Sequence, residues 1–203
     1  GLKLVGTGNT GSSSQGTSIA LSSDGNTLAS GGYRDNTNIG AVWIFTRTGA
    51  TWSQQGAKLV GTGNAGTACR QGQSVALSSD GNTLASGGYD DNTYVGAVWI
   101  FTRNESIWSQ QGSKLVGTGS SGASSQGTSV ALSSDGNTLA SGGYTDGIAA
   151  SGAVWIFVRS DESWSQQGSK LTGTGYTGYP YQGVSVALSS DGNTLASGGY
   201  RDN

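Results

Sequence analysis

Three tryptophans stand in one recurring motif and could bind a ligand. Trp52, Trp108 and Trp164 each begin the segment Trp-Ser-Gln-Gln-Gly, at intervals of about 56 residues. Flanking hydroxyl and amide groups predict a half-exposed strand, and an exposed ring beside such groups can hold the C–H face of a sugar. The same rings could instead pack between neighbouring units. A glycan site in each unit and structural packing are therefore both open.

Catalytic groups are scarce in this sequence. It contains no histidine, and its single cysteine, Cys69, has no partner base. The carboxylates fall in turn sequences, and near-identical units spread chemistry evenly, whereas active sites are asymmetric. We therefore expect no enzymatic activity. Because Cys69 stands where the first unit has Ser13, we interpret it as an incidental thiol or as an intermolecular bridge.

The whole chain, 1–203, is a single array of repeats with a period of about 56 residues. One recurring segment reads Leu-Ser-Ser-Asp-Gly-Asn-Thr-Leu-Ala-Ser-Gly-Gly-Tyr, and it starts at Leu21, Leu77, Leu132 and Leu188. The third unit loses one residue before Asp135 and regains one within 145–151. Variation in length therefore falls in loops, as it does around a fixed scaffold.

Each unit predicts four strands and no helix. In the first unit these are Ser18–Ser22, Thr27–Ser30, Gly40–Arg47 and Thr51–Gln55, the last of which could continue through 58–60. Asp-Gly-Asn between the first two strands predicts a hairpin turn. The third strand, Gly-Ala-Val-Trp-Ile-Phe, is apolar on both faces, so it must lie between neighbouring sheets. Its tryptophans are expected in the core: Trp43, Trp99 and Trp155.

These patterns predict an all-β fold, a β-propeller with four-stranded blades of about 56 residues. The chain holds about 3.6 blades, and residues 1–16 complete a preceding one. A β-solenoid is the competing architecture, but its coils are shorter and lack hairpin turns at fixed places. The expected blades are approximately 17–60, 73–116, 128–172 and a partial 184–203.

The two ends of the array do not match. The first residues belong to a fourth strand, and the last unit stops before its most apolar strand. We expect either a window from a longer array or a second chain that supplies the missing strand. Joined head to tail through such sheet edges, copies would close into a ring or extend as a filament.

The repeat resembles the FG-GAP type, which builds the propellers of integrin α chains and many bacterial surface proteins. The resemblance covers nearly the whole chain and is most specific in Gly-Ala-Val-Trp-Ile-Phe and the Gly-Gly-Tyr before it. It implies a seven-bladed ring, an extracellular place, and adhesion or ligand binding. Residues 74–87 also resemble the middle of a WD40 blade, although the period is longer and the Gly-His and Trp-Asp marks are missing.

The FG-GAP resemblance also implies calcium, which such families hold in an Asp-rich loop. The matching positions depart from the alternating Asp-x-Asp-x-Asp-Gly pattern and offer one or two carboxylates per loop. An Asx-rich turn is the alternative. The candidate ligands are Asp35, Asn36 and Asn38, then Asp90, Asp91 and Asn92, and finally Asp146. No other cofactor is predicted.

The composition of the chain limits the classes of partner that it can bind. Charged residues are only 11% of the chain and the net charge is −2, so the basic face that a nucleic-acid binder needs is missing. No apolar run is long enough for a membrane span. Asn104 opens an Asn-Glu-Ser glycosylation sequon. We expect a non-enzymatic adhesion or recognition module outside the cell or on its surface. The alternatives are a repeat protein that polymerises into a filament or layer, and a multivalent glycan-binding lectin.

Overall fold

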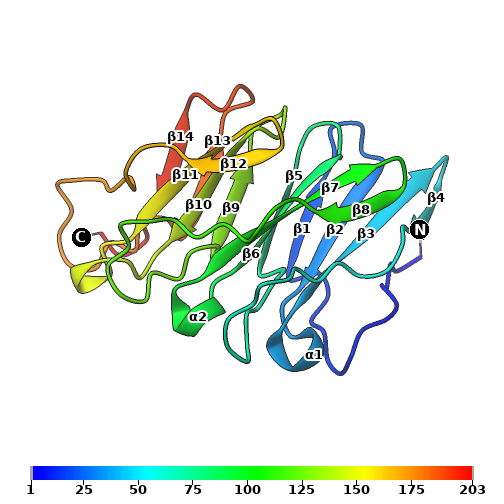
Figure 1. The fold of residues 1–203 in the computed structure, drawn as a ribbon, viewed down its shortest axis with the longest axis horizontal. Helices are drawn as coiled ribbons and strands as arrows, with labels where there is room; N and C mark the ends of the chain where they lie inside the picture. Colours follow the sequence, from blue (N-terminus) through cyan, green and yellow to red (C-terminus); the bar gives the residue numbers. More distant parts are fainter. Residues whose placement is uncertain (1, 203) are drawn as a thin grey trace.

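The computed structural model describes residues 2–202 and consists of four antiparallel sheets in chain order (Figure 1). Three sheets have four strands and the last has two. The first contains β1 (Ser18–Leu21), β2 (Thr27–Gly32), β3 (Ala41–Thr48) and β4 (Thr51–Gln54). The second contains β5 (Ser74–Leu77), β6 (Thr83–Gly88), β7 (Ala97–Asn104) and β8 (Ile107–Gln110). The third contains β9 (Ser129–Leu132), β10 (Thr138–Gly143), β11 (Ala153–Ser160) and β12 (Ser163–Gln166). The fourth pairs β13 (Ser185–Leu188) with β14 (Leu195–Gly198).

The sheets are blades of a β-propeller, which confirms the predicted fold class. Each blade follows the order first, second, third and fourth strand, as in β1-β2-β3-β4. The first strands of successive blades, β1, β5, β9 and β13, lie next to one another in space and form the inner row (Figure 1). The fourth strands lie farthest from this row, so each is the outer edge of its blade.

The core lies between blades, because each third strand buries both of its faces. Val42 and Ile44 of the first blade pack against Trp99 and Phe101 of the second. The same contact recurs one blade later, where Val98 meets Trp155. Trp43, Trp99 and Trp155 have no exposed surface, which confirms that they are core residues.

A glycine allows the incoming chain to lie flat on each core tryptophan. A Cβ on Gly61 would lie 2.0 Å from Cδ1 of Trp99, so no side chain fits there. The next residue, Thr62, accepts a hydrogen bond of 2.9 Å from the indole N–H of Trp99 through its carbonyl. The buried ring therefore has its one polar group satisfied.

The expected continuation of the fourth strand differs from what the structure shows. β4 ends at Gln54, and Leu59 pairs with Val42 as an isolated antiparallel bridge. The chain bulges away between them, since Gly56 adopts a φ of 71° that breaks the extended conformation. The 58–60 segment therefore lies beside the third strand without extending the fourth.

Three single helical turns lie in the connections between second and third strands: α1 (Asp35–Asn38), α2 (Asp91–Tyr94) and the 3-10 turn η1 (Ile148–Ala150). No sequence pattern indicates these turns, because they are too short for an apolar period. Asn36 and Thr37 have φ values of 48° and 57°. A β-branched residue in this left-handed region is strained, so the loop shape is held by its surroundings.

The blades therefore present two opposite faces. We call the upper edge in Figure 1 the turn face; it carries the hairpin turns that join first to second and third to fourth strands. We call the lower edge, with α1 and α2, the loop face. It carries the connections from second to third strand and from each blade to the next, including residues 33–40, 61–73, 89–96, 117–128, 144–152 and 173–184.

Candidate binding surface

The predicted ligand tryptophans line a groove that recurs between units. Trp108 and Trp164 are half-buried, and each borders a hollow against the segment that leaves the preceding blade. The hollow beside Trp164 has a volume of about 480 Å³, and the one beside Trp108 about 330 Å³. Trp52 lines a smaller one of about 210 Å³ with Leu2 and Leu4.

These tryptophans also connect neighbouring blades. The indole N–H of Trp108 donates a 2.8 Å hydrogen bond to the Gln55 side chain of the preceding blade, and Trp164 does the same to Gln111. The guanidinium of Arg103 lies 5.4 Å from the centre of the Trp108 ring. Packing between blades is thus present at both rings. Glycan binding in the grooves stays a prediction.

The predicted calcium loops hold buried ion pairs. The carboxylates of Asp35, Asp91 and Asp146 are at most 1% exposed, and each pairs with a lysine. In each case the lysine follows the fourth strand of the same blade: Lys58, Lys114 and Lys170. The second carboxylate oxygen accepts a backbone N–H, for example that of Ala65 at 2.8 Å from Asp91.

The other predicted calcium ligands are not drawn together around these carboxylates. Asp90 pairs with Arg70, while Asn36, Asn38 and Asn92 adopt left-handed backbone conformations in the helical turns. Within residues 2–202 no group of three His, Cys, Asp or Glu side chains could hold a metal ion. Calcium stays a prediction, and an ion at these loops would compete with a lysine for each buried carboxylate.

Cys69 lies in the core between the first two blades and has no exposed surface. Burial, and the nearby Asp91 carboxylate, raise the pKa of its thiol to about 12. A buried, protonated thiol is neither reactive nor accessible to a second chain. The structure therefore favours the incidental thiol over the intermolecular bridge.

All eight tyrosines of the chain lie on the loop face. None of them was predicted from the sequence as a site residue. Four follow the Gly-Gly pair at the end of a second strand: Tyr33, Tyr89, Tyr144 and Tyr200. The other four lie in neighbouring loops: Tyr94, Tyr176, Tyr179 and Tyr181. Tyr94, Tyr179 and Tyr200 are 46%, 57% and 62% exposed.

Arginines stack on these rings across the junctions between blades. The Arg70 guanidinium lies 5.7 Å from the ring centre of Tyr33 in the first blade and 5.3 Å from that of Tyr89 in the second. At the last junction Tyr181 takes the equivalent place and stacks on Tyr200 at 5.4 Å. We call these tyrosines, with Arg34, Arg70 and Arg201, the Tyr/Arg band.

The loop face also carries most of the differences between units. The residue before the recurring glutamine and the residue after Gly-Gly-Tyr vary between units, and in three units the two side chains are in contact. Arg70 donates to Asp90 at 2.8 Å, Thr145 donates to Ser125 at 2.8 Å, and Arg201 lies 5.2 Å from the Tyr181 ring. Each pair keeps a contact while its chemistry differs.

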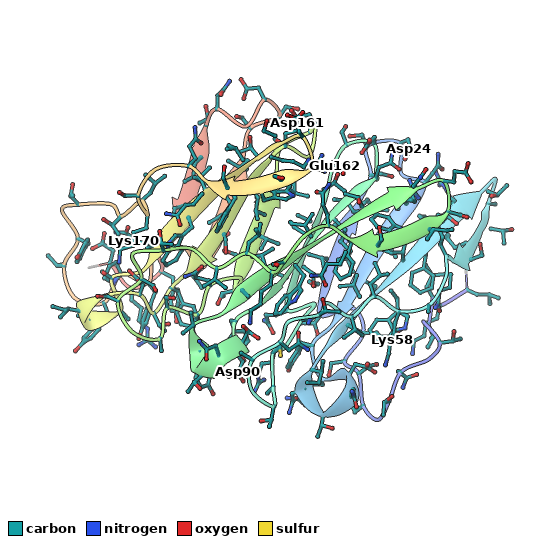
Figure 2. All side chains as sticks on the ribbon, in the orientation of Figure 1. Asp24, Lys58, Asp90, Asp161, Glu162 and Lys170 are labelled. Carbon is teal, nitrogen blue, oxygen red and sulfur yellow. The ribbon has the colours of Figure 1, made fainter. Side chains whose placement is uncertain are left out.

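On the turn face, the turn between the first and second strands is the same in every unit, whereas the hairpin between the third and fourth strands varies in sequence. The hydroxyl of Ser22 and the backbone N–H of Asn26 donate to Asp24, which lowers the pKa of that carboxyl to about 2. Neighbouring turns are joined by backbone hydrogen bonds, such as the 2.9 Å bond from Ser23 to Ser79. In Figure 2 Asp24, Asp161 and Glu162 lie on this upper side, whereas Asp90 and Lys58 lie lower.

Known proteins support the fold. The family model "WD domain, G-beta repeat" matches residues 71–95. A putative 6-phosphogluconolactonase from Bacteroides uniformis aligns over 89% of this chain and 46% of its own length, at 14% identity and a TM-score of 0.57. TolB from Acinetobacter baumannii aligns over 89% and 36%, at 14% identity and a TM-score of 0.49. No curated protein matches the sequence.

These likenesses establish the architecture alone. The WD match covers only residues 71–95 and concerns another type of repeat. The FG-GAP resemblance therefore stays a prediction. The chain spans less than half the length of the two solved proteins. Among residues 2–202 no helix combines the length and apolar character needed to cross a membrane. The comparisons and the sheet topology together identify this chain as a set of β-propeller blades.

Proposed function

We propose that this chain is a non-enzymatic recognition module that binds a protein partner through the Tyr/Arg band of its loop face. One observation carries the proposal: the units differ most on this face, and every tyrosine is found there. Tyrosine and arginine are enriched at protein interfaces, because they give large contact areas with polar ends. Loops held by a rigid scaffold are the usual place for binding residues.

A place outside the cell or on its surface fits the same features. The surface relies on neutral hydrogen-bonding groups, with only 11% charged residues. The Asn104 sequon lies exposed at the tip of the β7–β8 hairpin, where a glycan could be attached. Detection of the protein on intact source cells, and its removal by protease added outside them, would test this location.

The interface test compares exposed residues on the two faces. Tyr94→Ser together with Tyr179→Ser removes two exposed rings of the band, and the control Ile107→Ser removes a 72% exposed side chain on the turn face. Purified chain is applied to an array of extracellular proteins and glycans. We expect the tyrosine variant to lose about tenfold or more in affinity for the protein bound by the unaltered chain. Equal affinity of the tyrosine variant and the unaltered chain would refute the proposal.

Glycan binding is the second candidate, and the recurrence of the tryptophan grooves favours it. The groove beside Trp164 combines its half-buried ring with the Gln166 amide and the Ser163 hydroxyl. Substitution of Trp52, Trp108 and Trp164 by leucine should abolish binding to any glycan spots on the same array. Retained binding to those spots would remove the grooves as the site.

Head-to-tail assembly stays a further prediction. The blades join through nearly the same contacts at successive junctions, so blades of separate copies could use them as well. Electron microscopy of the purified protein, with intact mass measured on the same sample, separates the possibilities. Filaments with a regular rise would support assembly, and discrete particles would oppose it.

A further inference from the structure

Arg34 of the Tyr/Arg band carries a positive charge that no carboxylate of the described residues pairs with. The Arg34 side chain is exposed and lies 5.3 Å from the ring centre of Tyr33. Within the described part of the chain its guanidinium has neither an ion pair nor a hydrogen-bond partner. The nearest carboxylate in sequence, Asp35, is fully buried and paired with Lys58. Arg34 is therefore a surplus charge held on an aromatic ring.

Arg70, at the junction with the next blade, shows which group an arginine stacked on a tyrosine ring can bind. Arg70 lies over the same Tyr33 ring, at 5.7 Å, and over Tyr89 as well. Its Nε donates to the Asp90 carboxylate at 2.8 Å, and this hydrogen bond raises the pKa of the guanidinium. A guanidinium that lies on a ring keeps its N–H groups free in its own plane, where a carboxylate can accept them.

We infer that Arg34 binds a carboxylate of an acidic segment of the partner protein, as Arg70 binds Asp90 within the chain. This inference rests on the proposed recognition face and specifies its partner. The carboxylates near Arg34 and Arg70 are already used, since Asp35, Asp90 and Asp91 each have a cation. Arg201 repeats the arrangement over Tyr200 at 5.6 Å and also lacks an ion pair within residues 2–202. The recognised segment then carries acidic side chains that meet cations spread along the band.

Three variants separate the inference from its alternatives. Arg34→Gln removes the free cation. Arg47→Gln is the matched control, because Arg47 is also exposed and lies 5.7 Å from a Trp52 ring, but on the turn face with its Nε bonded to Asn26. Asp90→Asn releases Arg70 from its internal partner and so supplies a second free guanidinium beside Tyr33.

The probe is a blocked tetraglutamate peptide, titrated into ¹⁵N-labelled protein while the arginine Nε–Hε resonances are followed by NMR. We expect the Arg34 resonance to shift. Arg34→Gln should weaken binding about three- to fivefold, Asp90→Asn should strengthen it about threefold, and Arg47→Gln should leave it unchanged. Added salt should weaken binding, since the contact is exposed.

The following results would overturn the inference or the proposed recognition face. An Arg34 shift with tetraglutamine, or tighter binding of inorganic phosphate than of tetraglutamate, would overturn the inference of an acidic protein segment. Equal effects of Arg34→Gln and Arg47→Gln would overturn the site itself. If tetraglutamate fails while the tyrosine variant still loses its partner, the acidic partner is wrong and the recognition face stands. If tetraglutamate binds at Arg34 while the tyrosine variant keeps its partner, the recognition face is wrong.

Discussion

The turn face and the loop face are built from the same repeating unit, yet they differ in how their polar groups are used. On the turn face, Ser22, Asp24 and Asn26 satisfy one another inside a single turn, and the same set recurs in every unit. On the loop face the contacts join separate loops, as Lys58 does to Asp35 and Arg70 does to Tyr33, and exposed tyrosines vary around them. Self-contained contacts keep a surface constant, whereas contacts between loops leave room for residues to change.

The loop face has a buried layer of ion pairs and an exposed layer, the Tyr/Arg band. Its buried Asp–Lys pairs are present in each of the first three blades and hold the loops in place. The exposed Tyr/Arg band above them has no such uniformity. The comparison therefore predicts that substitutions in the buried pairs reduce stability, while substitutions in the band reduce binding.

The largest effect is expected from the buried pairs. Asp91→Asn leaves the ammonium of Lys114, whose side chain is 18% exposed, without its anion. We expect a loss of about 2–3 kcal/mol in the free energy of unfolding, measured by urea unfolding followed with circular dichroism. The control Asp90→Asn breaks a more exposed pair and should cost less than about 1 kcal/mol. Equal losses of unfolding free energy in the two variants would mean that burial does not distinguish the two layers of the loop face.

A smaller loss is expected on the turn face. The Ser78 hydroxyl is buried, donates to Asp80 at 2.5 Å and accepts the Thr83 N–H at 2.9 Å. Ser78→Ala leaves that N–H unsatisfied and should cost about 1–2 kcal/mol in urea unfolding. The adjacent Ser79→Ala removes a more exposed hydroxyl and serves as the control. Loss of partner binding by Ser78→Ala at unchanged stability would contradict the division between the faces.

Acid should weaken the turn face first. The Ser22 hydroxyl lowers the pKa of Asp24, and the Ser133 and Ser189 hydroxyls likewise lower those of Asp135 and Asp191. A pKa lower in the folded than in the unfolded chain gives stability above the unfolded value of 3.8 that is lost as pH falls towards 2. Urea midpoints measured from pH 5 to pH 2 should fall, and less steeply in Asp24→Asn. A flat profile would show that the turns do not depend on these carboxylates.

The smallest effect is expected from calcium. Lys58, Lys114 and Lys170 already neutralise the buried carboxylates of the loop face. Millimolar calcium should therefore leave the melting temperature within about 1 °C of its value in EDTA. A rise of several degrees that disappears in Asp91→Asn would show that calcium displaces the lysines, and the loop face would then be metal-dependent.

Local patterns predicted the scaffold well. The expected third strand Gly40–Arg47 corresponds to β3 (Ala41–Thr48), because a run that is apolar on both faces has one stable environment between blades. The turn at Asp24-Gly25-Asn26 was equally clear, since its hydrogen bonds close within a few residues. Such features depend only on neighbours in sequence.

The contacts of the loop face could not be predicted in this way. Lys58 and Asp35 are 23 residues apart and lie in separate connections of one blade, so the position of the lysine in the sequence did not indicate its partner. Arg70 lies between Tyr33 and Tyr89 only because adjacent blades bring their loops together. The one available signal was compositional: the tyrosines coincide with the segments in which the units differ.

The Asp–Lys pairs have a consequence for how such an array can change in length. Each buried aspartate pairs with a lysine 23 or 24 residues further along the chain, as Asp91 does with Lys114. A gene segment of one period, copied or deleted with its breakpoints at any matching codon, restores an aspartate followed by its lysine at the new seam. Unequal exchange between repeats can therefore add or remove blades without a new interface having to evolve, and selection remains free to diversify the exposed loops copy by copy.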